Sequence, residues 1–504
     1  MLNILYNPKT SIFQRIETLI RTQGELPEDF EPEEREYGEN ELRFAPGAKE
    51  GIFGHHTAGN SEESGFVETL KEYLELEESE ALKRFEEEKA GSFDTASEHT
   101  PLLKTIIDHA EEYNAGKVAA LAYYFAGKGT KCETVKLGLT LLALFNFSEN
   151  EKVCYLLKNL GYCEEFTSYV AANVVDWEEQ KKQDFYFELA KKLKGWGKID
   201  IVEKMTADTR EKKEWILCHG CKNTIMNAYL AYECAVKCDL QARLQEGFLT
   251  EEQLRGASDI MDGLLDEGPC DGMSAMENPV ELALSYLEEL DRHVWTVHYA
   301  NQVHDIFDYF FGSEIEDSAS VNVKALDILG TLDGETMIKD ELPENTYACL
   351  KLCKHYNVDL SEELIGLMEQ DFAKYYHYCY YLFLKNSMVA EFFELCDKKI
   401  DASKYPRGMG DSLGLGKLGD GVLQLDMIVQ YMGKYPLQGR KLVEICIQSP
   451  LTRWRNMAAK AMRGWTERLK QPLAEIDAQL YDMVKNVYAI ECNENTKAMW
   501  EKLL

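Results

Sequence analysis

The sequence predicts an all-α protein built from repeated pairs of helices, and three observations support this fold class. Apolar residues recur at steps of three and four over most of the 504 residues, with almost no alternation of period two. From about Thr100 onward these stripes come in pairs that repeat roughly every 30 to 45 residues, with glycine at several of the turns between them. The chain is 45% apolar and holds only 12 prolines, so long disordered tracts are not expected.

Chain length also favours a repeat array. A chain of 504 residues exceeds one ordinary core and would usually divide into several domains. Repeat proteins are the exception, because each unit packs only against its neighbours. No apolar run approaches the ~20 residues of a membrane span, and the apolar start of the chain is interrupted by polar residues, unlike a signal peptide. We therefore expect a cytoplasmic protein whose 14 cysteines are reduced and mostly buried.

The order of the stripes divides the chain into six regions. These are an irregular N-terminal region, helical repeats, a linker or lid, further helical repeats, a glycine-rich loop and C-terminal helices of the repeat type: 1–97, 98–258, 259–280, 281–403, 404–421 and 422–504. In the first region one helix is expected near 11–22 and an acidic helix over 66–89. Single helices are also expected over 346–356 and 362–384. A domain boundary, or a bend, is predicted at 259–280.

Charge narrows the possible partners. The chain carries 88 acidic and 55 basic residues, for a formal net charge of −33. Nucleic-acid binding requires a basic stripe that releases phosphate counterions, and the densest basic stretch has only four lysines over 188–198. Nucleic acids and anionic membranes are therefore not expected as partners. The acidic surplus serves either solubility or an acidic docking surface.

A helix pair near the C-terminus is the most specific pattern in the chain. Ser449 and Pro450 close a turn between an apolar helix at 440–448 and a second helix. Proline suits this place because it ends one helix and fits the first turn of the next. The second helix places large and small apolar residues on one face at three- and four-residue steps: Leu451, Trp454, Ala458, Ala461 and Trp465.

This second helix resembles the HEAT repeat of α-solenoid proteins, whose second helix carries a branched apolar residue, an arginine and then paired alanines. The matching positions are Trp454, Arg455, Ala458, Ala459, Ala461 and Met462, with tryptophan in place of the usual valine. The resemblance implies a degenerate HEAT-like solenoid, capped by the irregular N-terminal region, that binds a protein or peptide partner on its concave surface. It also implies that Trp454 is buried where helix pairs meet and that Arg455 bonds an acidic or carbonyl group of the adjacent pair. Solenoids of this type that repair DNA are disfavoured by the acidic charge.

The glycine-rich loop contains Gly414, Gly416 and Gly419, formally a G-x-G-x-x-G motif. Dinucleotide binding requires that motif between a strand and a helix, and the preceding residues 397–404 do not have a strand pattern. A P-loop is not matched either, because Lys417 is followed by leucine. An ordinary loop, with no bound cofactor, is therefore expected.

Four cysteines have the spacing of a possible thiolate zinc site: Cys218, Cys221, Cys234 and Cys238. If residues 223–237 form a helix, the 13 residues from Cys221 to Cys234 rise ~20 Å. Structural zinc holds all its ligands at about 2.3 Å. The cysteines are therefore predicted to be structural, and no metal site is expected.

The first candidate pocket residues come from a histidine-rich helix expected over 293–311. His293, His298 and His304 are five and six residues apart, which places successive rings about 140° and 120° apart around the helix. They cannot converge on one metal from this helix alone, so buried or capping histidines are one interpretation. The alternative is a polar pocket, with His298, Asn301 and His304 as the candidate residues.

The second candidate segment is residues 43–57. Pro46 and glycines at 47, 51 and 54 oppose a long helix, although the apolar residues around them favour burial. One interpretation is a glycine-rich loop where a ligand or partner touches the backbone, with Arg43, His55 and His56 as candidates. The other is an N-terminal cap that folds over the first repeat.

The opening segment and the tryptophan-containing C-terminal helices also resemble bacterial proteins of a clostridial type, some of which carry the name limonene hydroxylase. That resemblance implies a monooxygenase, and hydroxylation of a hydrocarbon requires haem, flavin or non-haem iron. The sequence has no convincing dinucleotide fingerprint and no 2-His-1-carboxylate spacing, so no cofactor or catalytic residue is assigned. Two functions remain: a scaffold for a protein or peptide partner, or an oxidoreductase with a pocket between the N-terminal region and the central helices.

Overall fold

The protein is all-α, as the sequence predicts, with 69% of the residues that the structure describes in helices. The computed structural model describes residues 10–33, 44–56, 64–268, 270–412, 414 and 420–504. Over these ranges no β-strand occurs, and the single pairing of extended segments is an isolated bridge between Ser412 and Leu451. None of the helices in the described ranges has both the length and the apolar composition needed to cross a bilayer.

The helices form two compact units. Unit 1 comprises the described residues up to 295 together with 302–330, and unit 2 comprises 296–301 and the described residues from 331 onward. This division differs from the boundary predicted at 259–280, which lies inside unit 1. The first of those residues continue the helix α16 (Glu251–Leu265), because an apolar stripe persists through Ile260, Met261 and Leu264.

Unit 1 contains most of the helices from α2 to α19: α2 (Ile12–Gln23), α3 (Ala48–His56), α4 (Val67–Tyr73), α5 (Glu78–Glu88), α6 (Thr95–Asp108), α7 (Ala115–Lys128), α8 (Cys132–Leu142), α9 (Glu151–Gly161), α10 (Thr167–Asn173), α11 (Glu179–Ala190), α12 (Trp196–Lys204), α13 (Arg210–Trp215), α14 (Ala228–Lys237), α15 (Leu240–Glu246), α16, α17 (Pro279–Leu290) and α19 (Ser318–Thr331). The helix α18 (Val297–Gly312) begins in unit 2 and continues into unit 1.

Unit 2 contains the remaining helices: α20 (Gly334–Glu341), α21 (Thr346–Tyr356), α22 (Ser361–Gln370), α23 (Phe372–Tyr375), α24 (Cys379–Lys385), α25 (Val389–Lys399), α26 (Asp420–Val429), α27 (Arg440–Ile447), α28 (Thr452–Leu469), α29 (Leu473–Ile476), α30 (Ala478–Ile490) and α31 (Glu494–Glu501). Short turns join some of them, including the π-helical turn η2 (Ile216–Gly220) of unit 1 and the 3₁₀ turns η4 (Tyr376–Tyr378) and η6 (Met432–Lys434) of unit 2.

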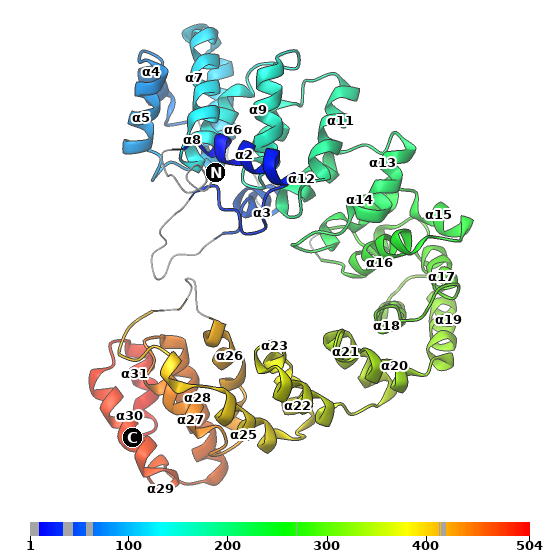
Figure 1. Cartoon of the computed structure of the whole chain (residues 1–504), viewed down its shortest axis with the longest axis vertical. Coiled ribbons are helices and arrows are strands. Elements are labelled where there is room, and N and C mark those ends of the chain that lie inside the picture. The colour runs from blue at the N-terminus through cyan, green and yellow to red at the C-terminus, as the bar shows by residue number, and fades with distance from the viewer. Residues whose placement is uncertain (1–9, 34–43, 57–63, 269, 413, 415–419) are drawn as a thin grey trace. The chain divides into compact units, whose positions relative to one another are not determined.

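In unit 1, consecutive helices pack as pairs: α7 with α8, α9 with α10 and α11 with α12 (Figure 1). The second members of the pairs also contact one another, since α8 meets α10 and α10 meets α12, which in turn meets α14. The helices α7 and α8 approach closely at Gly138 of α8, where a Cβ atom would overlap the backbone of Ala126 in α7. Glycine is therefore required at this crossing.

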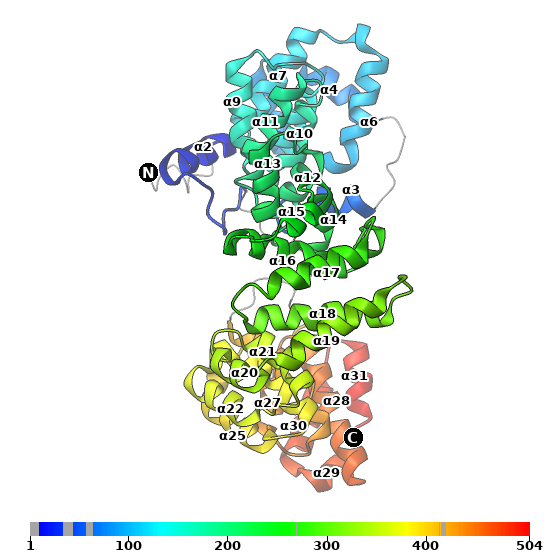
Figure 2. The same cartoon turned by 90° about the vertical axis from the view of Figure 1, so that its right-hand side faces the viewer.

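The N-terminal helices lie against these pairs. Figure 2 shows α2 beside α9, and α2 also packs against α7, while α3 packs against α12. The helix expected near 11–22 is α2, whose first turn is capped by the Ser11 hydroxyl. Residues 48–56, predicted as part of a glycine-rich loop, form α3 instead. The acidic helix predicted over 66–89 is broken at 74–77 into α4 and α5.

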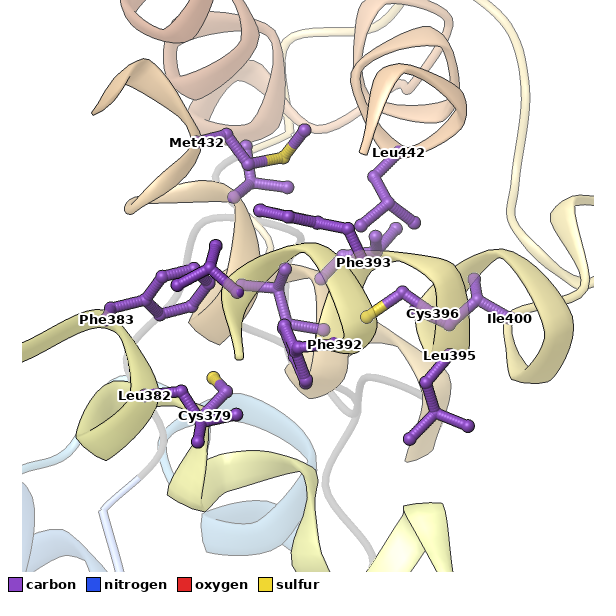
Figure 3. Packing of buried hydrophobic residues seen from close by; sticks show 14 of the residues in the cluster. Cys379, Leu382, Phe383, Phe392, Phe393, Leu395, Cys396, Ile400, Met432 and Leu442 are labelled. Carbon is purple, nitrogen blue, oxygen red and sulfur yellow. The ribbon is translucent and has the colours of Figure 1, made fainter. Parts of the chain in front are cut away.

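Unit 2 has a continuous apolar core, part of which is seen in Figure 3. The rings of Phe383 and Phe392 meet edge to face with centroids 5.6 Å apart. Cys379 and Cys396 are fully buried in this cluster and remain free thiols. Met432 of η6 also belongs to the cluster, which extends from Val297 in α18 to Leu503 after α31.

The C-terminal pair α27 and α28 has the contacts that the repeat pattern implies. Trp454 is 0% exposed, and its indole N–H donates to the Asp426 carboxylate of α26. Arg455 is also 0% exposed and donates to both carboxylate oxygens of Glu491 at the end of α30, at 2.8 Å each. The predicted burial of Trp454 and the predicted bond from Arg455 to the adjacent pair are both confirmed.

Candidate functional site

A small acidic pocket lies between α3 and the two helices α10 and α12. Its volume is about 50 Å³, and its walls include three carboxylates: Glu50, Glu164 and Asp200. Trp196 of α12 and Ser168 of α10 complete the walls together with three glycines, Gly47, Gly51 and Gly197. The pocket therefore lies between the N-terminal region and the central helices, where a pocket was expected for an enzyme.

Glu164 forms one wall of the pocket by capping α12. Its two oxygens accept hydrogen bonds from the backbone N–H groups of Lys194 (2.6 Å), Gly195 (2.7 Å) and Gly197 (2.5 Å). These N–H groups belong to the start of a helix, which has no internal acceptors for them and carries a positive partial charge. At Gly197 a Cβ atom would lie 2.5 Å from the Thr167 hydroxyl. Glu164 is therefore occupied as a structural cap.

Beside the pocket, a buried lysine joins α3, α8 and α10. Nζ of Lys136 in α8 lies 2.6 Å from Oε1 of Glu50 in α3 and 2.6 Å from Oε1 of Glu165, just before α10. Glu133, one turn earlier in α8, lies 3.6 Å from the same ammonium. The hydroxyl of Tyr169 in α10 donates to Glu50 (3.1 Å). We call Lys136, Glu50, Glu133 and Glu165 the lysine–glutamate cluster.

The cluster places one ammonium among three carboxylates, and the Lys136 side chain is only 4% exposed. Burial opposes the charge of Lys136, but Glu165 and Glu50 outweigh it and hold the pKa of the lysine above its usual range. Burial raises the pKa of Glu165 despite the opposing effect of Lys136. Loss of Lys136 would leave buried carboxylates without a counter-charge, so the cluster joins α3 to α8 and α10.

His99 of α6 lies at the edge of the cluster. Its ring packs edge to face against Tyr169 with centroids 5.3 Å apart, and its Nδ1 lies 2.8 Å from Oγ1 of Thr140. Burial lowers the pKa of His99 to about 4. The ring is therefore neutral near pH 7 and contributes packing and a hydrogen bond rather than charge.

A second perturbed carboxyl lies further along α12. Glu203 follows Trp196 and Asp200 at steps of four and three, which places it on the same face of the helix. Burial raises the pKa of Glu203 to about 7, against the opposing charge of Lys204 and with a further contribution from Asp200. A carboxyl that titrates near neutral pH is suited to exchange a proton with a group bound on that face.

The pocket does not fit the chemistry of a hydroxylase. A volume of about 50 Å³ holds one or two water molecules of about 30 Å³ each, whereas pockets for drug-sized ligands measure about 300–1,000 Å³. A terpene, a haem or a flavin is too large for it. Glu50 and Glu164 are moreover engaged by Lys136 and by α12. These carboxylate contacts instead hold α3 against α8, α10 and α12.

The three N-terminal candidate residues are placed only in part. Arg43 lies outside the described residues. His55 and His56 form the last turn of α3, and their side chains lie outside the described ones. The segment contributes Glu50 to the cluster, and the Gly47 N–H donates to Glu165 (3.0 Å); sequence reasoning did not single out Glu50.

The three candidates on α18 have different surroundings. Asn301 is 6% exposed, and its Nδ2 donates to the carbonyl one turn earlier (2.9 Å) and to that of Ala348 (2.7 Å). His298 is exposed, and His304 is half-buried with Nδ1 3.3 Å from the Asp308 carboxylate. Asn301 therefore joins two helices of unit 2, whereas His304 belongs to unit 1.

His293, predicted on the same helix, precedes it because α18 begins only at Val297. Its Nε2 lies 3.1 Å from Oε1 of the buried Glu289. The same carboxylate accepts the backbone N–H groups of Phe248 (3.2 Å) and Leu249 (2.6 Å). Phe248 has a φ of 58°, a left-handed conformation that is unfavourable for an aromatic residue. Glu289, with His293 beside it, stabilises this turn.

The four cysteines of the zinc-like pattern are all free thiols: Cys218, Cys221, Cys234 and Cys238. Burial raises the pKa of each thiol, so they are protonated near pH 7. In the part of the chain that the structure describes, three or more metal-ligating atoms come together in one exposed group: His109, Glu111 and Glu112. Exposed acidic groups of this kind are common on protein surfaces without a bound ion. This group is therefore not a candidate metal site.

Sequence reasoning missed the lysine–glutamate cluster because its members are far apart in the chain. Lys136 and Glu50 are separated by 86 positions, and no local spacing links them. One signal was available: Lys136 falls within α8, where every residue from 134 to 142 is buried. A lysine on such a helix needs a buried partner, although the sequence does not say which one.

Comparison with known proteins adds no family to this geometry. No family model matches the chain, and no match is found among curated proteins or among solved structures. What the chain does must follow from the contacts described above.

Proposed function

We propose that the chain is a degenerate HEAT-like helical-repeat scaffold that binds a protein or peptide partner. The binding surface in this proposal is the face formed by α8, α10, α12 and α14, which we call the repeat face. The observation that supports it most is the succession of contacts from α8 to α10, α12 and α14. Repeat proteins build extended binding surfaces from the corresponding faces of successive units in this way.

The C-terminal helices support the same architecture. Trp454 and Arg455 occupy the positions that the repeat pattern assigns to them, and both are fully buried. Arg455 joins α28 to the end of α30 through Glu491. A contact between neighbouring helix pairs is the kind of interface on which repeat arrays depend.

Site-specific photocrosslinking tests the proposed surface. Lys204 is exposed on α12 one turn after Asp200, so it lies on the repeat face. Tyr123 is 40% exposed on α7, a first member of its pair, and serves as the control. A photoreactive amino acid at Lys204 is expected to capture a discrete polypeptide in cells that make the protein, and one at Tyr123 is not. Equal capture at both positions, or no capture at Lys204 in any variant of the chain, would contradict the proposal.

A further inference from the structure

The repeat face is already occupied in part by a segment of the chain itself. The helix α3 lies on it through contacts to three helices. Glu50 reaches Lys136 of α8 (2.6 Å) and Tyr169 of α10 (3.1 Å). Gly51 lies against the indole of Trp196 in α12. The segment thus contacts second members of three successive pairs at once.

The surface on which α3 packs, which we call the seat, follows the backbone of α3 closely. At Gly51 a Cβ atom would overlap the indole ring of Trp196, and at Gly47 it would lie 2.5 Å from the carbonyl oxygen of Glu164. Neither neighbour is the flexible end of a long side chain, so the close approach requires glycine. The Gly47 N–H also donates to Glu165 (3.0 Å). The seat therefore accepts a helix with a carboxylate next to a glycine.

The helix α3 has little stability of its own. It is 9 residues long, shorter than the ~12–15 residues at which isolated helices become marginal in water. Gly51 and Gly54 disfavour the helix further. Ile52 remains 37% exposed even in the docked helix, so its apolar side chain is only partly removed from water. The helical state of this segment therefore depends on its contacts with the seat, including the Lys49–Asp94 ion pair (2.7 Å).

We propose that α3 is an intramolecular occupant of the partner site, and that a partner docks there as a short helix with a carboxylate on Lys136 and a glycine on Trp196. This inference rests on the proposed scaffold function and names the partner element and its regulation. Lys136 keeps its contact with Glu165 (2.6 Å) during the exchange, and the carboxylate of the partner replaces Glu50 as α3 leaves, so the buried ammonium always has a counter-charge. A tethered helix competes at an effective concentration on the order of millimolar, so α3 is autoinhibitory.

A displaced α3 and a synthetic copy of it test this inference in the full-length chain. Gly51→Leu is expected to force α3 off Trp196. Gly330→Leu is the matched control, because this helical glycine in α19 has no neighbouring atom within 4 Å. The probe is a fluorescein-labelled peptide with the sequence of residues 44–56. The Gly51→Leu chain should bind it at least about tenfold more tightly than the wild type or Gly330→Leu. Hydrogen exchange at 48–56 should rise in the Gly51→Leu chain alone.

The chemistry of the seat is tested through the peptide. Glu50→Gln in the peptide should weaken binding to the Gly51→Leu chain about tenfold, which corresponds to about 1.4 kcal/mol. Lys49→Gln should weaken it less than about threefold, because the Lys49–Asp94 pair is partly exposed. Equal effects of the two changes would overturn the assignment of Lys136 as the recognition element.

The peptide-binding and hydrogen-exchange results can each overturn the proposed role of α3. Equal peptide binding by the wild type and the Gly51→Leu chain would place the site elsewhere, and absence of binding to a chain whose α3 amides exchange freely would overturn the inference. If Gly51→Leu left these amides protected, Glu50→Lys would displace α3 by charge repulsion instead, and absence of peptide binding to the Glu50→Lys chain would again overturn the inference.

Photocrosslinking at Lys204 separates the two proposals. Partner capture that is unaffected by Gly51→Leu and by the peptide would refute only the role of α3, whereas loss of capture in every chain would refute the scaffold function.

Discussion

Arg455 and Glu491 form a doubly hydrogen-bonded ion pair in which both side chains are 0% exposed. Nε and Nη2 of Arg455 each donate to one oxygen of Glu491 at 2.8 Å, and Nη1 donates to the carbonyl of Ser449 at 2.8 Å. The Trp500 indole N–H adds a bond to Glu491 (3.1 Å). Burial alone would raise the pKa of Glu491, but Arg455 and the other donors hold it below its usual range.

Removing one partner of this pair should be costly. Arg455→Met is expected to lower the free energy of unfolding by about 3–5 kcal/mol, because it leaves Glu491 buried without a counter-charge. Arg463→Met is the control, since Arg463 pairs with Glu467 on the surface and such pairs contribute at most about 1 kcal/mol. The double variant Arg455→Met/Glu491→Leu should recover most of the loss. Urea unfolding curves that place Arg455→Met beside Arg463→Met would contradict this account of the pair.

Trp454 fills the junction between helix pairs, so its truncation should also be severe. Trp454→Ala is expected to cost about 3–5 kcal/mol, as for large buried aromatic residues in general. Lys460→Ala, on the exposed side of the same helix, should be nearly neutral. Thermal melts provide the comparison. Because Arg455 is fully buried, we expect Arg455→Met to cost about as much as Trp454→Ala. A wild-type melting temperature for Trp454→Ala would show that this helix is not part of a packed junction.

Glu203 should make the protein less stable as pH rises. Its folded pKa of about 7 lies above the usual value of about 4.3 for glutamate, so the folded state holds the proton more tightly. The resulting stabilisation is fully present below about pH 4.5 and is lost as pH rises through 7, by up to about 3 kcal/mol. Glu203→Gln should match the wild type near pH 4.5 and exceed it at pH 8. Identical differences at the two pH values, by urea unfolding, would refute the raised pKa.

His99 should act in the opposite direction. Its folded pKa of about 4 lies below the usual value of about 6.5, so the unfolded state binds the proton first. The stability that this neutral ring provides is present above about pH 6.5 and is lost as pH falls towards 4, by up to about 3 kcal/mol. His99→Phe removes the titration and should flatten that part of the profile. If the wild type and His99→Phe lose stability in parallel between pH 6.5 and 4, the ring titrates normally.

The sequence could predict the all-α class and many helices, but not where helices break. The helix α21 has the bounds predicted for 346–356, because one continuous apolar stripe is closed by Asn357 in a left-handed conformation. The single helix predicted over 362–384 is instead divided, because the Asp371 side chain caps a new turn at Phe372 and η4 interrupts the next. Apolar spacing is similar on both sides of such a cap, so periodicity alone does not detect it.

The candidate site was less predictable than the fold. Arg455 had a specific local pattern around it, and its partner type was predicted correctly. Glu50, Lys136 and Glu165 come from three elements that only tertiary packing brings together. The glycines of the segment containing Glu50 disfavour a long helix, and contacts with the seat, rather than its own propensity, account for the short helix that it forms.

Hydrogen exchange of the Trp454→Ala chain tests the central claim most directly, namely that each helix pair is stabilised by its neighbours alone. In a repeat scaffold, stability is a sum of local units and nearest-neighbour interfaces, and amides open in contiguous groups. We predict faster exchange in α26, α27, α28 and the helices that follow them, with wild-type protection in α20 to α22 of the same unit. A rise in exchange throughout unit 2 together would show one cooperative core and would contradict the repeat architecture.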